Sequence, residues 1–280
     1  MAATSILNPV ANIVAMSRAA ALIKRHRGLL GAMTMRDLRD RYTGQVLGSG
    51  WAILTPLLTM AVYVFVFTFI FRGRLGEDST GFAFTAFALA GLAPWLAFQE
   101  GLARSVSAIS GNSNLIKQIV FPSEVLPLKI ALATLPTLFI GLVVAIGTSF
   151  YAGTATAFGL LVLLPFSILC YIVLLSGLSF LLAAIGVFFR DLKDVIAFFL
   201  AVGLFLHPIL FPPGAAPKWL EGAFEYSPVS HLIWCFHAAI VGPVDPHPMS
   251  WIILPSVSVI VFIVGWRTFQ WLKPTFGNAL

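Results

Sequence analysis

Residues 36–58 read RDLRDRYTGQVLGSGWAILTPLL, with five charges in the first six residues and none in the rest. The charged part stands directly against an apolar segment that begins at Trp51. Of the 280 residues, 59% are hydrophobic and 10% are charged, whereas a soluble domain carries about 25% charged residues. The abrupt change within this stretch is therefore typical of a chain that passes from a membrane surface into the hydrocarbon core.

Six apolar segments are long enough, or nearly so, for helices that cross a hydrocarbon core of about 30 Å. The stretch 130–189 contains no charge over sixty residues, enough for two helices joined by a turn at 152–154. The sequence thus predicts an all-α integral membrane protein with six transmembrane helices. The segments are 51–71, 82–98, two within 130–189, 195–211 and 251–266.

Lysine and arginine are unevenly divided between the two sides that six spans create. Fourteen of the 17 lie on the side that holds both termini, and three lie on the other. Because cytoplasmic loops carry an excess of these residues, both termini are predicted to be cytoplasmic, and the first residues lack the features of a secretory signal. The formal net charge of +6 then reflects topology and attraction to anionic lipid, with no module for nucleic acid.

The residues before the first span have the pattern of a helix that lies in the membrane surface. In 29–48, apolar residues share one broad side and the arginines and aspartates occupy the other. Gly44, Gly48 and Gly50 then let the chain bend into the bilayer at Trp51. A solvated juxtamembrane helix with no further task is the alternative. The apolar residues are Leu30, Met33, Leu38, Tyr42 and Val46.

Polar residues inside the spans are few. Thr55, Thr59 and Tyr63 follow at steps of four along the first span, which places them on one helix face. Such a stripe suits interhelical hydrogen bonds as well as the lining of a polar conduit, and both interpretations stay open. Near the end of the second span, Glu100 and Arg104 are four apart and can pair locally, with a proton relay through Glu100 as the alternative.

Two segments between spans also have a distinct pattern. Residues 111–129, GNSNLIKQIVFPSEVLPLK, predict a short amphipathic helix that ends near Pro122, and its apolar side needs cover from the bilayer or from a soluble partner. Residues 212–250 are rich in proline, yet the centre, 226–241, is too apolar for water and short for a crossing. We expect two short helices there that dip back into the outer leaflet, covered by protein.

Motifs for catalysis are missing from the sequence. There is no G-x-x-x-x-G-K-[ST] loop, no H-E-x-x-H and no G-x-S-x-G. The five histidines lack metal-ligand spacing, and the two cysteines do not suggest a disulfide framework. We therefore expect no enzyme, no metal and no cofactor bound by this chain, and a source of energy in another protein.

Four pieces of the sequence, in order, resemble the permease subunit of type-2 bacterial ABC exporters for polysaccharides such as O-antigen, capsule and teichoic acid. The resemblance covers residues 30–272. It implies a homodimer of six-span chains in the bacterial inner membrane, joined to two copies of a separate ATPase that binds ATP. The pieces are RDLRDRYTGQVLGSGWAILTPLL, NLIKQIVFPSEVLPL, FFRDLKD and HPILFPP...KWLEGAFEYSPVSHLIWCFHAAIVG.

The resemblance also assigns parts of the chain. It divides the chain into a cytoplasmic N-terminal segment 1–50 with a gate helix at 34–46, a transmembrane domain 51–272 and a cytoplasmic tail 273–280. Segment 112–124 corresponds to a coupling helix that enters a cleft of the ATPase, and 212–242 to outer re-entrant helices. The expected coupling residues are Asn114, Leu115, Ile116, Lys117, Ile119, Phe121 and Glu124.

The expected cargo is a glycan on undecaprenyl diphosphate, or on another lipid in the capsule branch, with O-antigen favoured. Because guanidinium pairs well with phosphate, gate-helix residues are candidates for binding the diphosphate, although attraction to ordinary anionic lipid explains the arginines equally. These residues are Arg36, Arg39, Arg41 and Tyr42.

A polymer longer than the membrane is thick needs a continuous conduit, which the dimer would form. Aromatic rings stack on the apolar faces of sugars without holding them firmly. Tyr63 and Trp95, together with Thr55 and Thr59, are therefore the candidate conduit residues. Two other functions remain as alternatives: a type-2 exporter of a drug or small lipid, and an integral-membrane transferase, for which no constellation of histidines or carboxylates is found.

Overall fold

The computed structural model describes residues 9–71, 81–118, 121–242 and 247–280, and these residues form helices and turns but no strand. The α-helices are α2 (Pro9–Arg25), α3 (Arg27–Asp40), α4 (Trp51–Phe65), α5 (Gly81–Ser105), α6 (Ser113–Gln118), α7 (Val125–Ala133), α8 (Leu135–Ala152), α9 (Leu164–Gly186), α10 (Leu192–Leu206), α11 (Lys218–Tyr226), α12 (Pro228–Val241), α13 (Ser250–Leu272) and α14 (Phe276–Ala279). Short 3-10 helices are η1 (Gly48–Gly50), η3 (Ser110–Asn112) and η5 (Lys273–Thr275), and π-helical turns are η2 (Val66–Phe71) and η4 (Gly159–Leu163).

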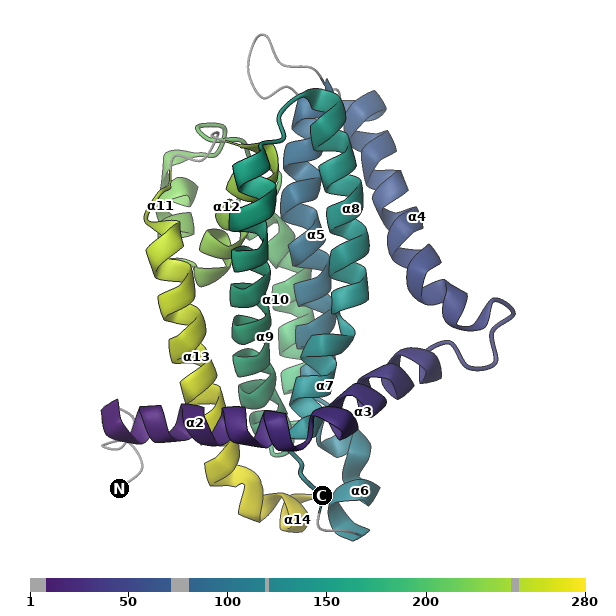
Figure 1. Ribbon diagram of the computed structural model, residues 1–280, viewed down its shortest axis with the longest axis vertical. Coiled ribbons are helices and arrows are strands. Elements are labelled where there is room, and N and C mark those ends of the chain that lie inside the picture. Colours follow the sequence, from purple (N-terminus) through teal and green to yellow (C-terminus); the bar gives the residue numbers. More distant parts are fainter. Residues whose placement is uncertain (1–8, 72–80, 119–120, 243–246) are drawn as a thin grey trace.

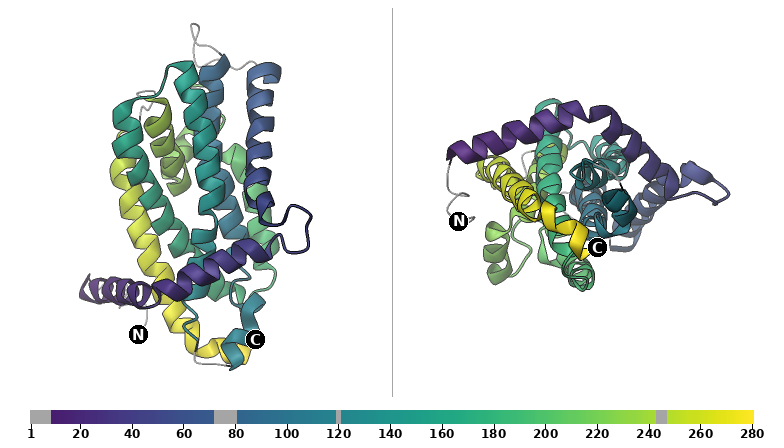
Figure 2. Two further views of the ribbon diagram at one scale, coloured as in Figure 1. Left: turned by 45° about the vertical axis from the view of Figure 1, so that its right-hand side comes forward. Right: turned by 90° about the horizontal axis from the view of Figure 1, so that it is seen from below.

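The long helices run side by side as a bundle, and α2 and α3 lie across one of its ends (Figure 1). We call this the α3 end; α6 and α14 extend beyond it. We call the opposite end, where α11 lies, the α11 end. α2, for which the sequence suggested no role, packs against α13 and wraps the side of the bundle with α3 (Figure 2).

Among the described residues, five helical segments are long and apolar enough to cross a membrane, and each overlaps a predicted span. The turn predicted at 152–154 is also present, because Gly153 adopts a left-handed φ of 71° that ends α8. The prediction of an all-α, multi-pass membrane protein is therefore confirmed for the described residues. The segments are Gly48–Ile70, Gly81–Ser105, Val125–Ala152, Gly159–Gly186 and Ser250–Ala279.

The predicted span at 195–211 is shorter in the structure than expected. α10 has 15 residues, or about 22 Å of helix, against a hydrocarbon core of about 30 Å. The helix ends because His207 is extended, the conformation favoured ahead of a proline such as Pro208. The count of six spans therefore stays a prediction.

The two short helices expected within 212–250 are present as α11 and α12. α12 lies inside the upper bundle, against α5, α9 and α13 (Figure 1), and most of its residues are buried. Protein thus covers the α12 backbone, as a helix that ends within a membrane requires. The depth at which the pair sits in a bilayer stays a prediction.

Small residues hold the bundle together. α5 lies at its centre and buries an alanine-rich face, which lets neighbouring helices approach closely. At the crossing of α9 and α13 two glycines face each other: a Cβ added to Gly265 would lie 2.0 Å from the carbonyl oxygen of Gly177. By contrast α4, at the edge of the bundle, is largely exposed (Figure 1).

The amphipathic helix predicted for 29–48 is wrong at its C-terminal end. α3 stops at Asp40 and turns follow, because Gly44 and Gly48 take positive φ values of 83° and 49°. The predicted separation of sides also fails in part. Asp37, expected on the charged outer side, faces the bundle with a side chain only 13% exposed.

Candidate gate and coupling site

Five charged side chains from three parts of the chain meet where α3 lies against the bundle. Asp37 and Arg41 come from α3 and the residue after it, Glu100 and Arg104 come from α5, and Lys129 comes from α7. Their side chains are between 10% and 28% exposed. We call this group the ion cluster.

Asp37 is the carboxylate with the most partners in the ion cluster. Its Oδ2 accepts a hydrogen bond from Arg104 and lies 3.4 Å from Nη2 of Arg41. Its Oδ1 lies 3.6 Å from Nζ of Lys129. One α3 residue thus contacts cations from α5 and α7 as well as from its own helix end.

Glu100 connects the same cations to α8. Its Oε1 accepts a hydrogen bond from Arg41 and lies 3.7 Å from Nη1 of Arg104, four residues away. This local pair is the one expected from the sequence. Its Oε2 accepts a 2.8 Å hydrogen bond from the Thr137 hydroxyl in α8, and Arg41 also donates to the backbone carbonyl of Ala133 at the end of α7, at 3.3 Å.

The ion cluster holds three cations and two carboxylates, so its formal charge is +1. Taking charges out of water is costly unless each finds a partner. α3 is therefore held to α5 and α7 directly, and to α8 through Glu100. Removing any one member of the ion cluster would leave another buried charge without its partner. The sequence missed the roles of Asp37 and Lys129, although a lysine next to an apolar segment is a signal for such a site.

The gate-helix residues proposed for the lipid diphosphate are not all gathered in one place. Arg36 and Arg39 are exposed, and Nε of Arg36 lies 3.3 Å from Oδ2 of Asp40. Arg41 belongs to the ion cluster, and within the described structure its Nε has no hydrogen-bond partner. Tyr42 is partly exposed in the following turn. Their binding of diphosphate stays a prediction.

The expected coupling segment begins as the short helix α6, which has six residues. Asn114 and Lys117 are exposed, while Ile116 packs against a buried cluster that includes Phe276 of α14. The chain's own C-terminal region therefore covers part of the apolar side that the sequence left without cover. Ile119 lies outside the described residues.

The remaining coupling residues are also turned toward the protein. Leu115 is partly exposed, and Phe121 packs against the same cluster as Ile116. Glu124, directly before α7, is buried, and its Oε1 accepts hydrogen bonds from Nζ of Lys273 at 2.7 Å and from Nε2 of Gln270 at 2.8 Å. Glu124 therefore anchors the start of α7 to the end of α13.

Burial acts to raise the pKa of the Glu124 carboxyl, but the hydrogen bonds from Lys273 and Gln270 outweigh it and hold the pKa below the usual 4.5. A carboxyl whose pKa is lower in the folded than in the unfolded chain adds stability above the unfolded value. This stability is lost as the pH falls from about 4.5 through the folded pKa. The anchor is therefore fully present at neutral pH.

Glu124→Gln is expected to lower the free energy of unfolding by about 1 to 2 kcal/mol at pH 7, because Lys273 then lacks its carboxylate. The difference from the parent protein should shrink between pH 5 and pH 3. Thermal unfolding of the purified chain in detergent at these pH values measures it. Asp191→Asn, at an exposed position, is the matched control, and equal melting of the two variants at pH 7 would contradict the anchor.

The expected conduit residues lie in different surroundings. Thr55 is exposed, and the Thr59 hydroxyl donates a 2.9 Å hydrogen bond to the backbone carbonyl of Thr55, one turn earlier in α4. Tyr63 is partly exposed and stacks on Phe67, with ring centroids 5.8 Å apart. Trp95 is 2% exposed, so in this conformation it offers no surface to a conduit.

Trp95 instead fills the space beside α10. Its ring lies edge-on to His207, with centroids 5.4 Å apart, and a Cβ on Gly203 would lie 2.5 Å from it. Among the described residues, no three His, Cys, Asp or Glu side chains are placed to hold a metal ion. Cys170 and Cys235 are both buried thiols.

Comparison with known proteins finds a matching family and several relatives of similar sequence. The family model for the ABC-2 type transporter matches residues 28–241. The O-antigen export system permease protein RfbA of Myxococcus xanthus is 32% identical over 91% of this chain and 96% of the relative. RfbA of Klebsiella pneumoniae is 26% identical over 90% and 95%, and the polysialic acid transport protein KpsM of Escherichia coli is 25% identical over 84% and 89%.

Proposed function

Because the chain belongs to the ABC-2 type transporter family, we propose that it is the channel-forming membrane subunit of an ATP-driven exporter of lipid-linked polysaccharide, with O-antigen as the favoured cargo. The observation that carries the proposal is the 32% identity to an O-antigen export permease across 91% of the chain. The location is the bacterial inner membrane. Both termini lie in the cytoplasm, which the fourteen-to-three division of lysine and arginine supports.

The active assembly in this proposal is a homodimer bound to two copies of a separate ATPase that binds the ATP. The exposed apolar side chains of α4 form a surface that is too large to face water. In the assembly, a second copy of the chain or lipid would cover this surface. α10, a partial span alone, would complete the sixth crossing with the residues that follow it. Exposed apolar side chains of α4 are Ile53, Leu57, Leu58, Val62 and Phe65.

The proposed route of coupling runs from α6 to α3. The ATPase pushes the exposed side of α6. Ile116 of α6 packs on the buried cluster that includes Val125 and Leu126 of α7, so the movement reaches α7 through this cluster. Lys129, further along α7, contacts Asp37 of α3. Rigid elements joined by ion pairs can carry such movement, so the gate helix would follow α7 when ATP is bound and hydrolysed.

The lipid diphosphate would enter beside α3. Arg36 and Arg39 are exposed there, and a phosphate could also draw on the spare positive charge of the ion cluster. The glycan would then pass along a conduit between two copies, with Thr55, Thr59 and Tyr63 of α4 in its lining. Weak stacking on aromatic rings lets a polymer slide.

Deletion of the gene tests the cargo. Cells that lack the chain are expected to lose surface polysaccharide and to accumulate it on its lipid carrier at the cytoplasmic face, and the parent chain should restore export. Normal surface polysaccharide after deletion would contradict the proposal. Transport of a drug or small lipid, in a strain whose polysaccharide is unchanged, would favour the alternative type-2 exporter.

Lys117→Glu tests the coupling role of α6. Because Lys117 is exposed, the variant should fold normally but export about tenfold less polysaccharide, as reversal of an interface charge typically costs one or more kcal/mol. Lys24→Glu is the matched control, since Lys24 is also exposed and lies outside the family match. Surface polysaccharide is measured at equal protein level, and equal export by both variants would exclude a contact of Lys117 with the ATPase.

A further inference from the structure

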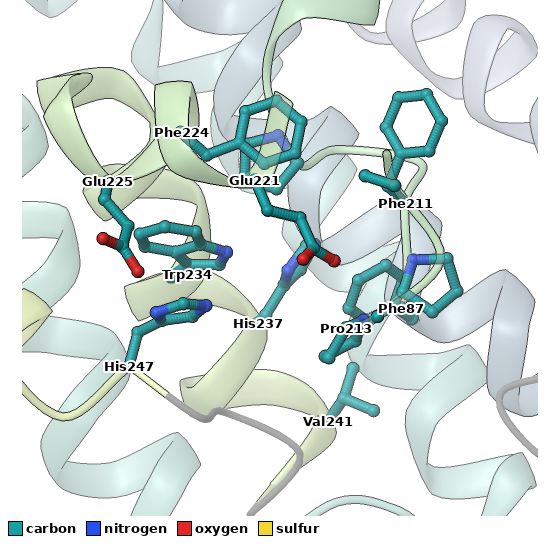
Figure 3. A pocket seen from close by; sticks show the side chains of 14 residues that line it. Phe87, Phe211, Pro213, Glu221, Phe224, Glu225, Trp234, His237, Val241 and His247 are labelled. Carbon is teal, nitrogen blue, oxygen red and sulfur yellow. The ribbon is translucent and has the colours of Figure 1, made fainter. Parts of the chain in front are cut away.

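A pocket of about 290 Å³ opens at the α11 end, far from the ion cluster. It is lined by side chains of α5, α11 and α12, of the loop between α10 and α11, and by His247, which precedes α13 (Figure 3). This size is at the lower limit for sites that hold small molecules. The pocket has three chemical features that together indicate a type of ligand.

The first feature is a set of aromatic walls. Phe87, Phe211, Phe224 and Trp234 line the pocket (Figure 3). Phe211 is partly exposed and offers its ring to the pocket, whereas the other three are at most 7% exposed and form its buried floor. The ring of Trp234 is itself stacked on that of His247, with centroids 3.6 Å apart and an interplanar angle of 13°. Flat apolar rings of this kind pack well against the C–H faces of sugars.

The second feature is a buried histidine with an unpaired ring nitrogen. His237 lines the pocket and is 5% exposed, and its ring packs on Phe87, with centroids 3.9 Å apart. A backbone group of Phe87 lies close enough to interact with one ring nitrogen, and within the described structure no side chain pairs with the other. Leaving a buried polar group unpaired is costly, so a ligand with a hydroxyl group would complete this site.

The third feature is negative charge. Glu221 and Glu225 line the pocket, and the ion pairs found among the described residues include neither of them. Figure 3 shows the Glu221 carboxylate directed into the middle of the pocket and the Glu225 carboxylate at its edge, beside Trp234. Carboxylates accept strong hydrogen bonds from hydroxyl or ammonium groups and repel another carboxylate.

We propose that this pocket binds one pyranose ring of the exported glycan, and that it selects rings without an acid group. The sugar ring would stack on Phe211, donate hydroxyl or ammonium hydrogens to the two glutamates and pair with His237. This inference rests on the proposed export of polysaccharide. It adds a sugar-selective site on the side away from the coupling segment, and it excludes acidic polymers as good ligands there.

Saturation-transfer NMR on the purified full-length chain in nanodiscs tests the proposal without requiring transport. The probes are the methyl glycosides of glucose, glucosamine and glucuronic acid, which share a ring and differ in charge. Signal transfer is expected for the first two. The glucuronide should bind roughly three- to tenfold more weakly, as expected for like charges near a protein surface. In the double variant Glu221→Gln with Glu225→Gln, the affinity for the glucuronide should approach the affinity for the glucoside.

The double variant Asp191→Asn with Asp194→Asn is the matched control, because it removes the same amount of charge at exposed positions elsewhere. It should bind the three glycosides with the same order of affinity as the parent protein. No transfer to any glycoside, equal binding of the glucuronide by the parent protein, or the same change in both double variants would each overturn the proposal. Export of polysaccharide by cells that carry the parent chain is scored separately. A failed binding test with intact export therefore rejects the pocket and not the exporter.

Discussion

Asp37→Asn is expected to lower the free energy of unfolding by about 3 kcal/mol and to abolish export of polysaccharide. The substitution keeps the size of the side chain but removes the carboxylate that lies against Arg41, Arg104 and Lys129. Three cations then face Glu100 alone in a site that is mostly shielded from water. Loss of one partner from a buried ion network typically costs about 3 to 5 kcal/mol, and partial exposure places this one at the lower value.

Asp40→Asn is the matched control for this variant. Asp40 lies on the same helix, but its side chain is 63% exposed and its partner Arg36 is 81% exposed, so the loss should be within about 1 kcal/mol. Thermal unfolding in detergent and the amount of surface polysaccharide are the two measurements. Adding Lys129→Met to Asp37→Asn removes one unpaired cation and should recover part of the stability. If the Asp37 and Asp40 variants melt alike, the ion cluster does not hold α3.

Gly265→Ala is expected to destabilise the bundle by about 3 kcal/mol or more, at the upper limit of what overpacking usually costs. The added Cβ would lie 2.0 Å from the carbonyl oxygen of Gly177 and 2.9 Å from its carbonyl carbon. Both are backbone atoms of α9, so no side chain can rotate away and the two helices must separate. The measurement is the fraction of purified protein that remains soluble and monodisperse after heating in detergent. This fraction should be much smaller for Gly265→Ala than for the parent protein.

Gly147→Ala makes the same chemical change in α8 at a position where a Cβ meets nothing within 4 Å. This variant should melt at the parent temperature or slightly above it, because alanine is the better helix former. Gly177→Ala should resemble Gly265→Ala, since its Cβ would lie 2.6 Å from the backbone nitrogen of Phe262. Normal folding of Gly265→Ala would show that the α9–α13 crossing is less tight than the structure indicates.

Local patterns made the transmembrane architecture predictable. Length and apolarity located the five long helical segments, because a helix in hydrocarbon must satisfy its own backbone and present apolar side chains. Gly153 marked the turn between α8 and the following helix because glycine readily adopts positive φ. The pair Glu100 and Arg104 was predictable for a similar reason, since residues four apart share a helix face.

The site was less predictable because its contacts join residues distant in the chain. Asp37 and Lys129 are far apart in sequence, and no periodicity indicates that a surface helix turns an aspartate toward the bundle. The helical face assigned to Tyr42 and Val46 does not form, because the helix ends at Asp40. Trp95 looked suitable for a conduit by its chemistry, but its burial against Gly203 depends on where α10 packs.

The sequence by itself determined that this chain is an all-helical membrane protein, where along the chain its five long apolar helices lie, and which family it resembles. Only the tertiary structure decided that charged residues of α3 join α5 and α7, that Glu124 is bound to α13, and that His237 faces a pocket with two glutamates. The physical reason is the range of the forces. Hydrophobicity and backbone hydrogen bonding act on neighbouring residues of a helix, whereas ion pairs and pockets arise from the packing of helices that the sequence does not order in space.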